Sequence, residues 1–97
     1  MNEYKYKTIK NVKEEVIKLA KKFPNFPQNV EIVSAEVVID KEGVQYLLIS
    51  FISKDIMDVY FHEIIDNLEN IIKNALEYIK DYYETQDIEM IEDEEEG

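Results

Sequence analysis

The sequence predicts a small α+β domain in which a helix, a β-hairpin and a long second helix follow one another. Three observations lead to this fold class: apolar residues at helical spacing near the N-terminus, two strand-like runs around a turn, and a long apolar repeat in the second half. The chain has 97 residues, of which 45% are hydrophobic, so it can build one core. We therefore expect residues 1–97 to form a single domain.

The first helix is predicted between Asn11 and Phe23. Asn11 followed three residues later by Glu14 resembles a capping box, which marks a helix start. Pro24 disfavours helical geometry at the residue before it and so ends the helix. The phenylalanines of the FPNFPQN connection are expected to pack on the core. The apolar face consists of Val12, Val16, Leu19, Ala20 and Phe23.

The hairpin is predicted from the runs VEIVSAEVVID and VQYLLISFISK, which flank Asp40–Gly43. An aspartate in the first position and a glycine in the fourth are typical of a type I turn with a glycine bulge. Pairing Asp40 with Val44 makes one face uniformly apolar, with the pairs Val37–Leu47, Ala35–Ile49 and Val33–Phe51. The other face is more apolar than a solvated sheet face should be, with the pairs Ile32–Ile52, Ser34–Ser50, Glu36–Leu48 and Val38–Tyr46.

A long helix is predicted from Asp55 to about Thr85, because apolar residues recur at alternating steps of four and three from Met57 to Tyr82. At 1.5 Å per residue it would be about 45 Å long, whereas an 11-residue strand spans only about 36 Å. This helix carries more apolar surface than the hairpin and the first helix can cover. The excess predicts a homodimer, formed by helix–helix packing or by joined sheets. The expected dimer seam is Leu68, Ile71, Ala75, Tyr78 and Tyr82.

The two ends of the chain leave an alternative open. Residues 3–9 alternate like an edge strand, and residues 87–91 resemble a last short strand. If both form, the order becomes β-α-β-β-α-β, a ferredoxin-like arrangement. Otherwise residues 87–97 are expected to be an acidic, partly disordered C-terminal tail.

Composition excludes several functions. Without cysteine, the chain has no disulfides and no zinc–thiolate sites, and this fits the cytoplasm. Neither a signal peptide nor a membrane-spanning run is evident, so no membrane partner is expected. All 11 basic residues are lysines and the net charge is −11, which argues against direct nucleic-acid binding.

Charge is distributed unevenly along the chain. Residues 1–54 hold 9 lysines and 7 acids, whereas residues 55–97 hold 2 lysines and 15 acids. On the predicted helix, Glu77 and Asp81 would be like charges one turn apart, which costs a few tenths of a kcal/mol. A helix that retains uncompensated negative charge is complementary to a basic surface, which suggests a basic partner. The expected partner-binding acidic face is Glu63, Asp66, Glu77, Asp81 and Glu84.

The stretch HEIID, at residues 62–66, differs by one residue from the helical zinc-protease motif HExxH. On the predicted helix, Asp58, His62 and Asp66 would share one stripe and hold a divalent ion only weakly. His62 is the only histidine, no serine occupies a nucleophile elbow, and no glycine-rich loop is present. We therefore expect no metal site, no cofactor and no catalytic residues.

Two hypotheses for function follow. The first is a non-catalytic acidic protein-binding module that mimics nucleic acid and inhibits a basic, nucleic-acid-handling protein, as a DNA mimic from a virus, phage or mobile element would. The alternative is a structural or assembly homodimer subunit whose apolar long-helix seam is the functional surface.

Overall fold

The computed structural model describes residues 6–96, with side chains up to residue 83. The α+β class is confirmed, with four antiparallel strands and two helices. The order β-α-β-β-β-α differs from the predicted helix–hairpin–helix because β1 and β4 are added, and from the ferredoxin-like alternative because the fourth strand, β4, precedes α2 instead of following it. In chain order the elements are β1 (Lys7–Asn11), α1 (Lys13–Lys22), β2 (Glu31–Ile39), β3 (Gln45–Ser53), β4 (Ile56–Glu63) and α2 (Leu68–Glu96).

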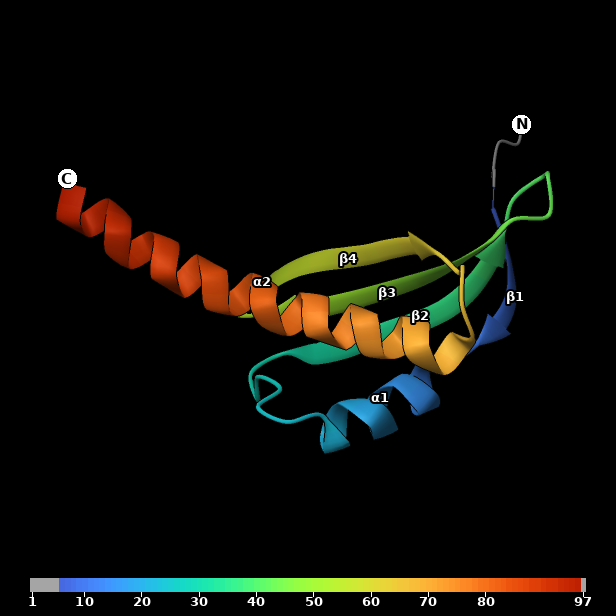
Figure 1. The fold of residues 1–97 in the computed structure, drawn as a ribbon, viewed down its shortest axis with the longest axis horizontal. Helices are drawn as coiled ribbons and strands as arrows, with labels where there is room; N and C mark the ends of the chain where they lie inside the picture. Colours follow the sequence, from blue (N-terminus) through green and yellow to red (C-terminus); the bar gives the residue numbers. More distant parts are fainter. Residues whose placement is uncertain (1–5, 97) are drawn as a thin grey trace.

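The strands lie in the order β1-β2-β3-β4, so each pairs with its neighbour in sequence. Both helices pack on the same face of this sheet, and α2 crosses it diagonally (Figure 1). The buried cluster between the layers joins Val12 and Val16 of the α1 region to Leu47, Ile49 and Phe51 of β3, along with α2 side chains. We call the opposite side, which neither helix covers, the outer face.

The hairpin between β2 and β3 confirms most of the predicted register. The N–H of Asp40 donates to the carbonyl of Val44 (3.0 Å), and Gly43 has a φ of 90°, as the predicted turn requires. Two predicted pairs, Val33–Phe51 and Ile32–Ile52, are wrong because a bulge lies between Ile32 and Ser34, so that Ile32 faces Phe51 and Glu31 faces Ile52. The confirmed pairs are Val37–Leu47, Ala35–Ile49, Ser34–Ser50, Glu36–Leu48 and Val38–Tyr46.

The predicted start of the long helix at Asp55 is wrong, because residues 56–63 form β4. Lys54 and Asp55 have φ values of 54° and 69°, and this two-residue turn pairs Ser53 with Ile56. Two successive positive φ values give the turn a twist that matches antiparallel strands. The residues that follow are mostly β-branched or aromatic, which favours a strand.

Helix α2 begins at Leu68, where the side-chain oxygen of Asn67 accepts the backbone N–H of Asn70 (2.9 Å). The strand considered for residues 87–91 does not form, because α2 continues to Glu96. The C-terminal part of α2, which includes most of the predicted tail, extends beyond the sheet (Figure 1). Within residues 6–96, neither helix carries an apolar stretch of the length that a membrane crossing requires.

Helix α1 begins two residues later than predicted. The side-chain oxygen of Asn11 accepts the backbone N–H of Lys13 (3.0 Å), at the point where β1 ends. Before Pro24, Phe23 leaves helical geometry with a ψ of 124°, as predicted. Phe23 and Phe26 lie edge to face at 6.3 Å and pack against the core, which confirms their expected role. The N-terminal strand expected over residues 3–9 is present in part, as β1 from Lys7 to Asn11, while residues 1–5 lie outside the described part.

Candidate interaction surfaces

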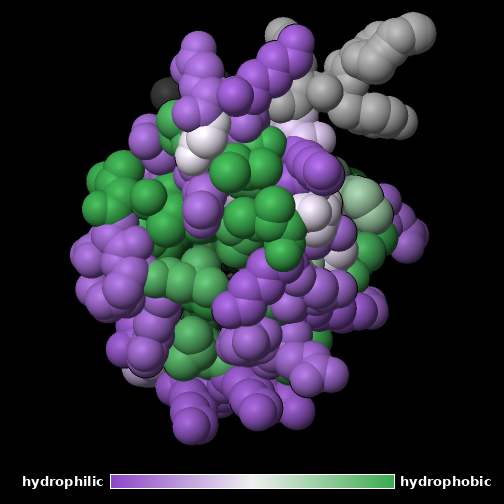
Figure 2. Space-filling view, turned by 90° about the vertical axis from the view of Figure 1, so that its right-hand side faces the viewer, coloured by the Kyte–Doolittle hydropathy of each residue, from purple (hydrophilic) through white to green (hydrophobic). Residues whose placement is uncertain are grey.

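The outer face of the sheet carries exposed apolar side chains on β4. Met57, Val59 and Phe61 alternate along the strand and are 56%, 53% and 43% exposed. Leu48 and Ile52 of β3 lie opposite Phe61 and Met57 and are only half-buried. Figure 2 shows hydrophobic side chains reaching the surface between hydrophilic ones at the end of the molecule where β1 and the start of α2 lie. An apolar surface of this kind is a candidate interaction site.

Three aromatic rings gather at one end of the outer face. Tyr46 and Phe61 stack with centroids 4.8 Å apart, and Tyr6 meets both edge-on at 5.5 and 5.3 Å. The Tyr46 hydroxyl donates to the carboxylate of Asp40 (3.2 Å). Partial burial, followed by the charge of Asp40, raises the pKa of Tyr46, whereas the N–H of Val44 contributes most to lowering the pKa of Asp40. The cluster is therefore anchored to the β2–β3 turn.

Strand β4 is an edge strand, and its free backbone groups can be assigned. The N–H of Ile64 donates to the carbonyl of Gln45 (2.9 Å), so the main chain at Ile64 points towards β3. Backbone groups alternate along an antiparallel strand, so residues 56, 58, 60 and 62 also point to β3, while residues 57, 59, 61 and 63 point outward. In agreement, the N–H of Val59 contacts the neighbouring Asp58 carboxylate (3.2 Å) instead of β3.

The core side of β4 bears a second aromatic row, which links the strand to α2. Tyr60 stacks on His62 at 6.1 Å and contacts Tyr78 at 5.3 Å, and Tyr78 stacks on Tyr82 at 6.3 Å. The Tyr82 hydroxyl donates to Asp58 (2.9 Å), and this hydrogen bond is the main cause that raises the pKa of Tyr82. Burial raises the pKa of Tyr60. Tyr78 is 50% exposed, so the row reaches the surface beside the free edge of β4.

The predicted dimer seam is divided between the core and the surface. Ile71 and Ala75 are 2% and 0% exposed within the single chain, and Leu68 packs against the same core. They face the chain's own sheet. This sheet has four strands instead of the predicted two, so it buries more of the apolar side of α2 than we expected from the sequence. Tyr78 and Tyr82 are the seam residues that remain accessible at the flank of α2.

The predicted acidic face is also divided. Glu77 and Asp81 are exposed on α2, and Glu84 belongs to the same helix, although its side chain lies outside the described part. Glu63 ends β4, and Asp66 lies in the connection before α2, so neither shares a helical face with them. The Asp66 carboxylate accepts the Asn67 N–H (2.7 Å) and the Asn70 amide (3.2 Å), and these bonds lower its pKa, the Asn67 bond most.

The weak metal candidate loses the helical stripe on which it was based. Asp58 and His62 lie on the core side of β4, whereas Asp66 lies beyond the strand. Asp58 accepts the Tyr82 hydroxyl, and the His62 Nδ1 is 2.8 Å from the Glu63 carbonyl. Across the part of the chain that the structure describes, no group of three acidic or histidine side chains is placed to hold a metal ion.

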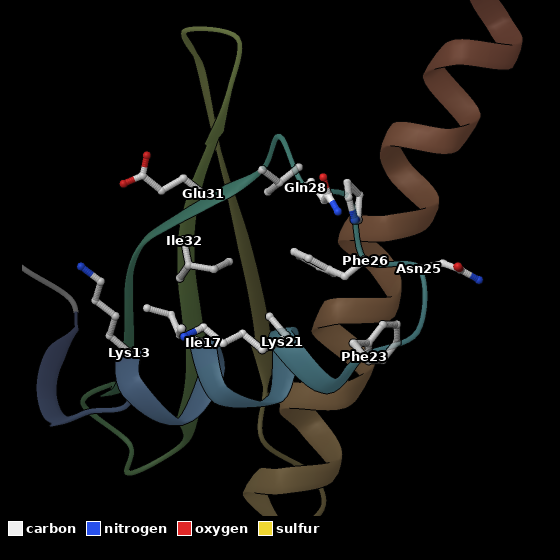
Figure 3. A pocket seen from close by; sticks show the side chains of 12 residues that line it. Lys13, Ile17, Lys21, Phe23, Asn25, Phe26, Gln28, Glu31 and Ile32 are labelled. Carbon is white, nitrogen blue, oxygen red and sulfur yellow. The ribbon is translucent and has the colours of Figure 1, made fainter.

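A hollow of about 680 Å³ lies between α1 and the connection to β2. In Figure 3, Ile32 and Phe26 point into it from opposite sides, and Lys13 and Lys21 come from α1 below. The hollow is of a size that small ligands occupy, but it is widely open. Sequence reasoning placed Phe23 and Phe26 against the core and did not anticipate this hollow.

Comparison of the chain with protein-family models, with curated proteins and with solved structures gives no match. The candidate surfaces therefore rest on the geometry alone. The residues that sequence reasoning missed are the outward residues of β4, Met57, Val59 and Phe61. The signal that could have identified them is the β-branched and aromatic content of residues 56–61, which favours a strand.

Proposed function

We propose that this chain is a non-catalytic protein-binding module that presents the acidic side of α2 to a basic protein. The observation that supports this proposal is the position of Glu77 and Asp81, which lie one helical turn apart and are both exposed. The same helix continues to Glu96 and extends beyond the sheet (Figure 1). This continuation adds no lysine and eight acids: Glu84, Asp87, Glu89, Glu92, Asp93, Glu94, Glu95 and Glu96.

Such a helix provides a concentrated negative field. Neighbouring lysines offset little of it: Lys80 lies 3.9 Å from Asp81, and Lys73 pairs with Glu69 (3.5 Å) at the other end of α2. Surface charges of one sign speed the encounter with an oppositely charged partner, and salt weakens their effect. A row of carboxylates competes with phosphates for a basic surface, so the partner class we propose is nucleic-acid-handling proteins, which the module would inhibit as a nucleic-acid mimic.

The test is capture of basic proteins from a nuclease-treated lysate by the immobilised chain, with elution by increasing salt. The test variant is Glu77→Lys with Asp81→Lys and Glu84→Lys. The matched control is Glu15→Lys with Glu31→Lys and Glu42→Lys, which changes three exposed acids on other elements by the same total charge. Circular dichroism verifies that both variants fold.

We expect the wild type and the control to retain the same nucleic-acid-binding proteins at low salt and to release them at high salt. The α2 variant should lose them. Displacement of labelled duplex DNA from a captured protein by the wild-type chain would establish the mimicry. Equal recovery by both variants, or recovery that salt does not change, would contradict the proposal.

The alternative, an assembly homodimer, stays a proposal, but it needs a different surface. Ile71 and Ala75 of the expected seam are buried under the chain's own sheet. The free edge of β4 and its flanking side chains are the surface that a second copy could reach.

A further inference from the structure

We propose that two copies of this chain associate through β4, antiparallel and around a two-fold axis at Tyr60, to form one continuous sheet. The occupant of the β4 edge is therefore a second copy of the same chain. This interface lies on a different surface from the acidic side of α2 and does not depend on the function proposed above.

The main chain of β4 defines the register of this pairing. The backbone groups of Met57, Val59, Phe61 and Glu63 point outward from the sheet. When Tyr60 lies opposite the second copy's Tyr60, Val59 lies opposite the second copy's Phe61, and Met57 opposite its Glu63. All four outward residues then exchange hydrogen bonds, about eight in total. A register with Val59 opposite itself would leave Glu63 unpaired.

Nothing in β4 opposes this pairing at the level of the backbone. Strand β4, residues 56–63, contains neither proline nor lysine, the residues with which proteins commonly protect a free edge. The strand has eight residues, and the N–H of Val59 currently has only the carboxylate of its neighbour Asp58 as acceptor. An edge strand of this length, with Met57, Val59 and Phe61 exposed on its outer side, is a template for another strand.

Complementary hydrogen-bonding side chains favour a second copy over an unrelated strand. In the register centred on Tyr60, Asp58 lies opposite the second copy's His62, and the two-fold axis creates this contact twice. Both side chains are on the core side of β4. An acid and an imidazole facing each other across two strands form a favourable cross-strand pair. Glu77 and Asp81 are exposed on the solvent side of α2, away from the joined strands.

The side chains on both faces also suit this interface. On the outer face, the exposed Val59 and Phe61 would cover each other across the axis. On the core side, Tyr78 is half exposed at the flank of α2 and contacts Tyr60, so the two helices would meet through tyrosines. Aromatic side chains are enriched at protein interfaces, where rings can be buried while hydroxyls stay hydrated.

The first test is sedimentation velocity of the wild-type chain over the micromolar range, together with Val59→Pro. Proline removes an outward N–H, and an edge strand tolerates it at such a position, so the chain should fold but dimerise at least tenfold more weakly. The matched control is Lys41→Pro in the β2–β3 turn, where proline suits the second turn position and the dimer should be unchanged. A wild type that is monomeric throughout, or a dimer that Val59→Pro leaves intact, would overturn the proposal.

The second test identifies the register through a single cysteine, because the chain has none. Tyr60→Cys would face itself in a non-hydrogen-bonded pair, where the Cα atoms are about 4.5 Å apart and a disulfide can form. We expect oxidation to give a covalent dimer with Tyr60→Cys and none with Thr8→Cys on the opposite edge of the sheet. Equal cross-linking of both, or cross-linking of Val59→Cys in preference to Tyr60→Cys, would overturn this register.

The two kinds of variant distinguish failure of this interface from failure of the proposed function. Reversal of the charges at Glu77, Asp81 and Glu84 should abolish capture of a basic partner and leave the dimer intact. Val59→Pro should have the reverse effect. If Tyr60→Cys does not fold, the sedimentation of wild type and Val59→Pro still decides whether β4 is the interface.

Discussion

The hydroxyl of Tyr82 on α2 donates a hydrogen bond to the carboxylate of Asp58 on β4, with 2.9 Å between the oxygens. This bond joins two residues that are 24 positions apart in the sequence and fixes the flank of α2 over the edge strand. It also explains how a carboxylate is accommodated on the core side of a sheet, since a partly buried charge requires a hydrogen-bond partner.

Tyr82→Phe should therefore lower the free energy of unfolding, because the Asp58 carboxylate loses its donor while the ring remains. Urea denaturation followed by circular dichroism measures the change. Tyr78→Phe is the control, since Tyr78 is half exposed and contacts Tyr60 and Tyr82 through its ring, which phenylalanine keeps. If both variants unfold at the wild-type midpoint, the Tyr82–Asp58 bond does not contribute to stability.

Stability should decrease at alkaline pH because of four tyrosines. Tyr46, Tyr60, Tyr82 and Tyr83 have pKa values raised above the ordinary value near 10, mainly by burial for Tyr46, Tyr60 and Tyr83 and mainly by the hydrogen bond to Asp58 for Tyr82. A raised pKa means that the folded state favours the protonated hydroxyl. The stabilisation is then complete below pH 10 and is lost as the pH rises through the raised values.

An ultraviolet titration of tyrosinate, combined with circular dichroism, tests this expectation. These four tyrosines should ionise above pH 10, and the final ionisation should coincide with loss of folded structure. Ionisation of all seven tyrosines of the chain in one step near pH 10, with the fold intact, would contradict it.

Leu76→Ala should destabilise the domain by about 2–5 kcal/mol, because it removes a fully buried side chain and leaves a cavity. Ile65→Ala is the matched control: Ile65 is 72% exposed and should change the free energy of unfolding by less than about 0.5 kcal/mol. A large effect at Ile65 would mean that the connection before α2 is packed differently.

Asp55→Gly should stabilise the β3–β4 hairpin by about 1 kcal/mol, because glycine adopts a positive φ without steric strain. The control is Lys41→Gly in the other hairpin, where the residue does not have a positive φ and glycine should be neutral or destabilising. Thermal denaturation compares the two. A lower melting temperature for Asp55→Gly would show that the two-residue turn is not formed in solution.

This turn also shows where sequence reasoning reached its limit. Asp40–Gly43 was recognised because a glycine occupies the position that requires positive φ, and the register that followed was confirmed except at the Val33 bulge. Lys54 and Asp55 adopt positive φ without any glycine or asparagine, so no local signal marked a turn. Met57, Phe61 and Ile64 are four and three positions apart, as on one face of a helix, so the pattern predicted a helix across β4.

The helix predicted across β4 also accounts for the wrong placement of several candidate site residues. A helix over residues 55–67 would place Asp58, His62 and Asp66 in one stripe, but the structure has no such stripe. The same helix would place Glu63 and Asp66 on the acidic face, whereas they lie at the end of β4 and in the connection before α2. Glu77 and Asp81 were placed correctly because their segment is a helix in both descriptions. The free edge of β4 could not be predicted, because an edge exists only when the sheet order is known.

The order of the elements has a consequence for synthesis on the ribosome. Helix α2 comes last in the chain, yet Ile72, Leu76 and Ile79 form the lid over Leu47 and Ile49. While the chain grows, hairpins can form within microseconds, whereas translation takes on the order of a tenth of a second per residue. Until α2 is made, the outer face of the nascent sheet is uncovered and its core face is covered only in part, by α1, so chains interrupted before Ile79 should be substrates for chaperones.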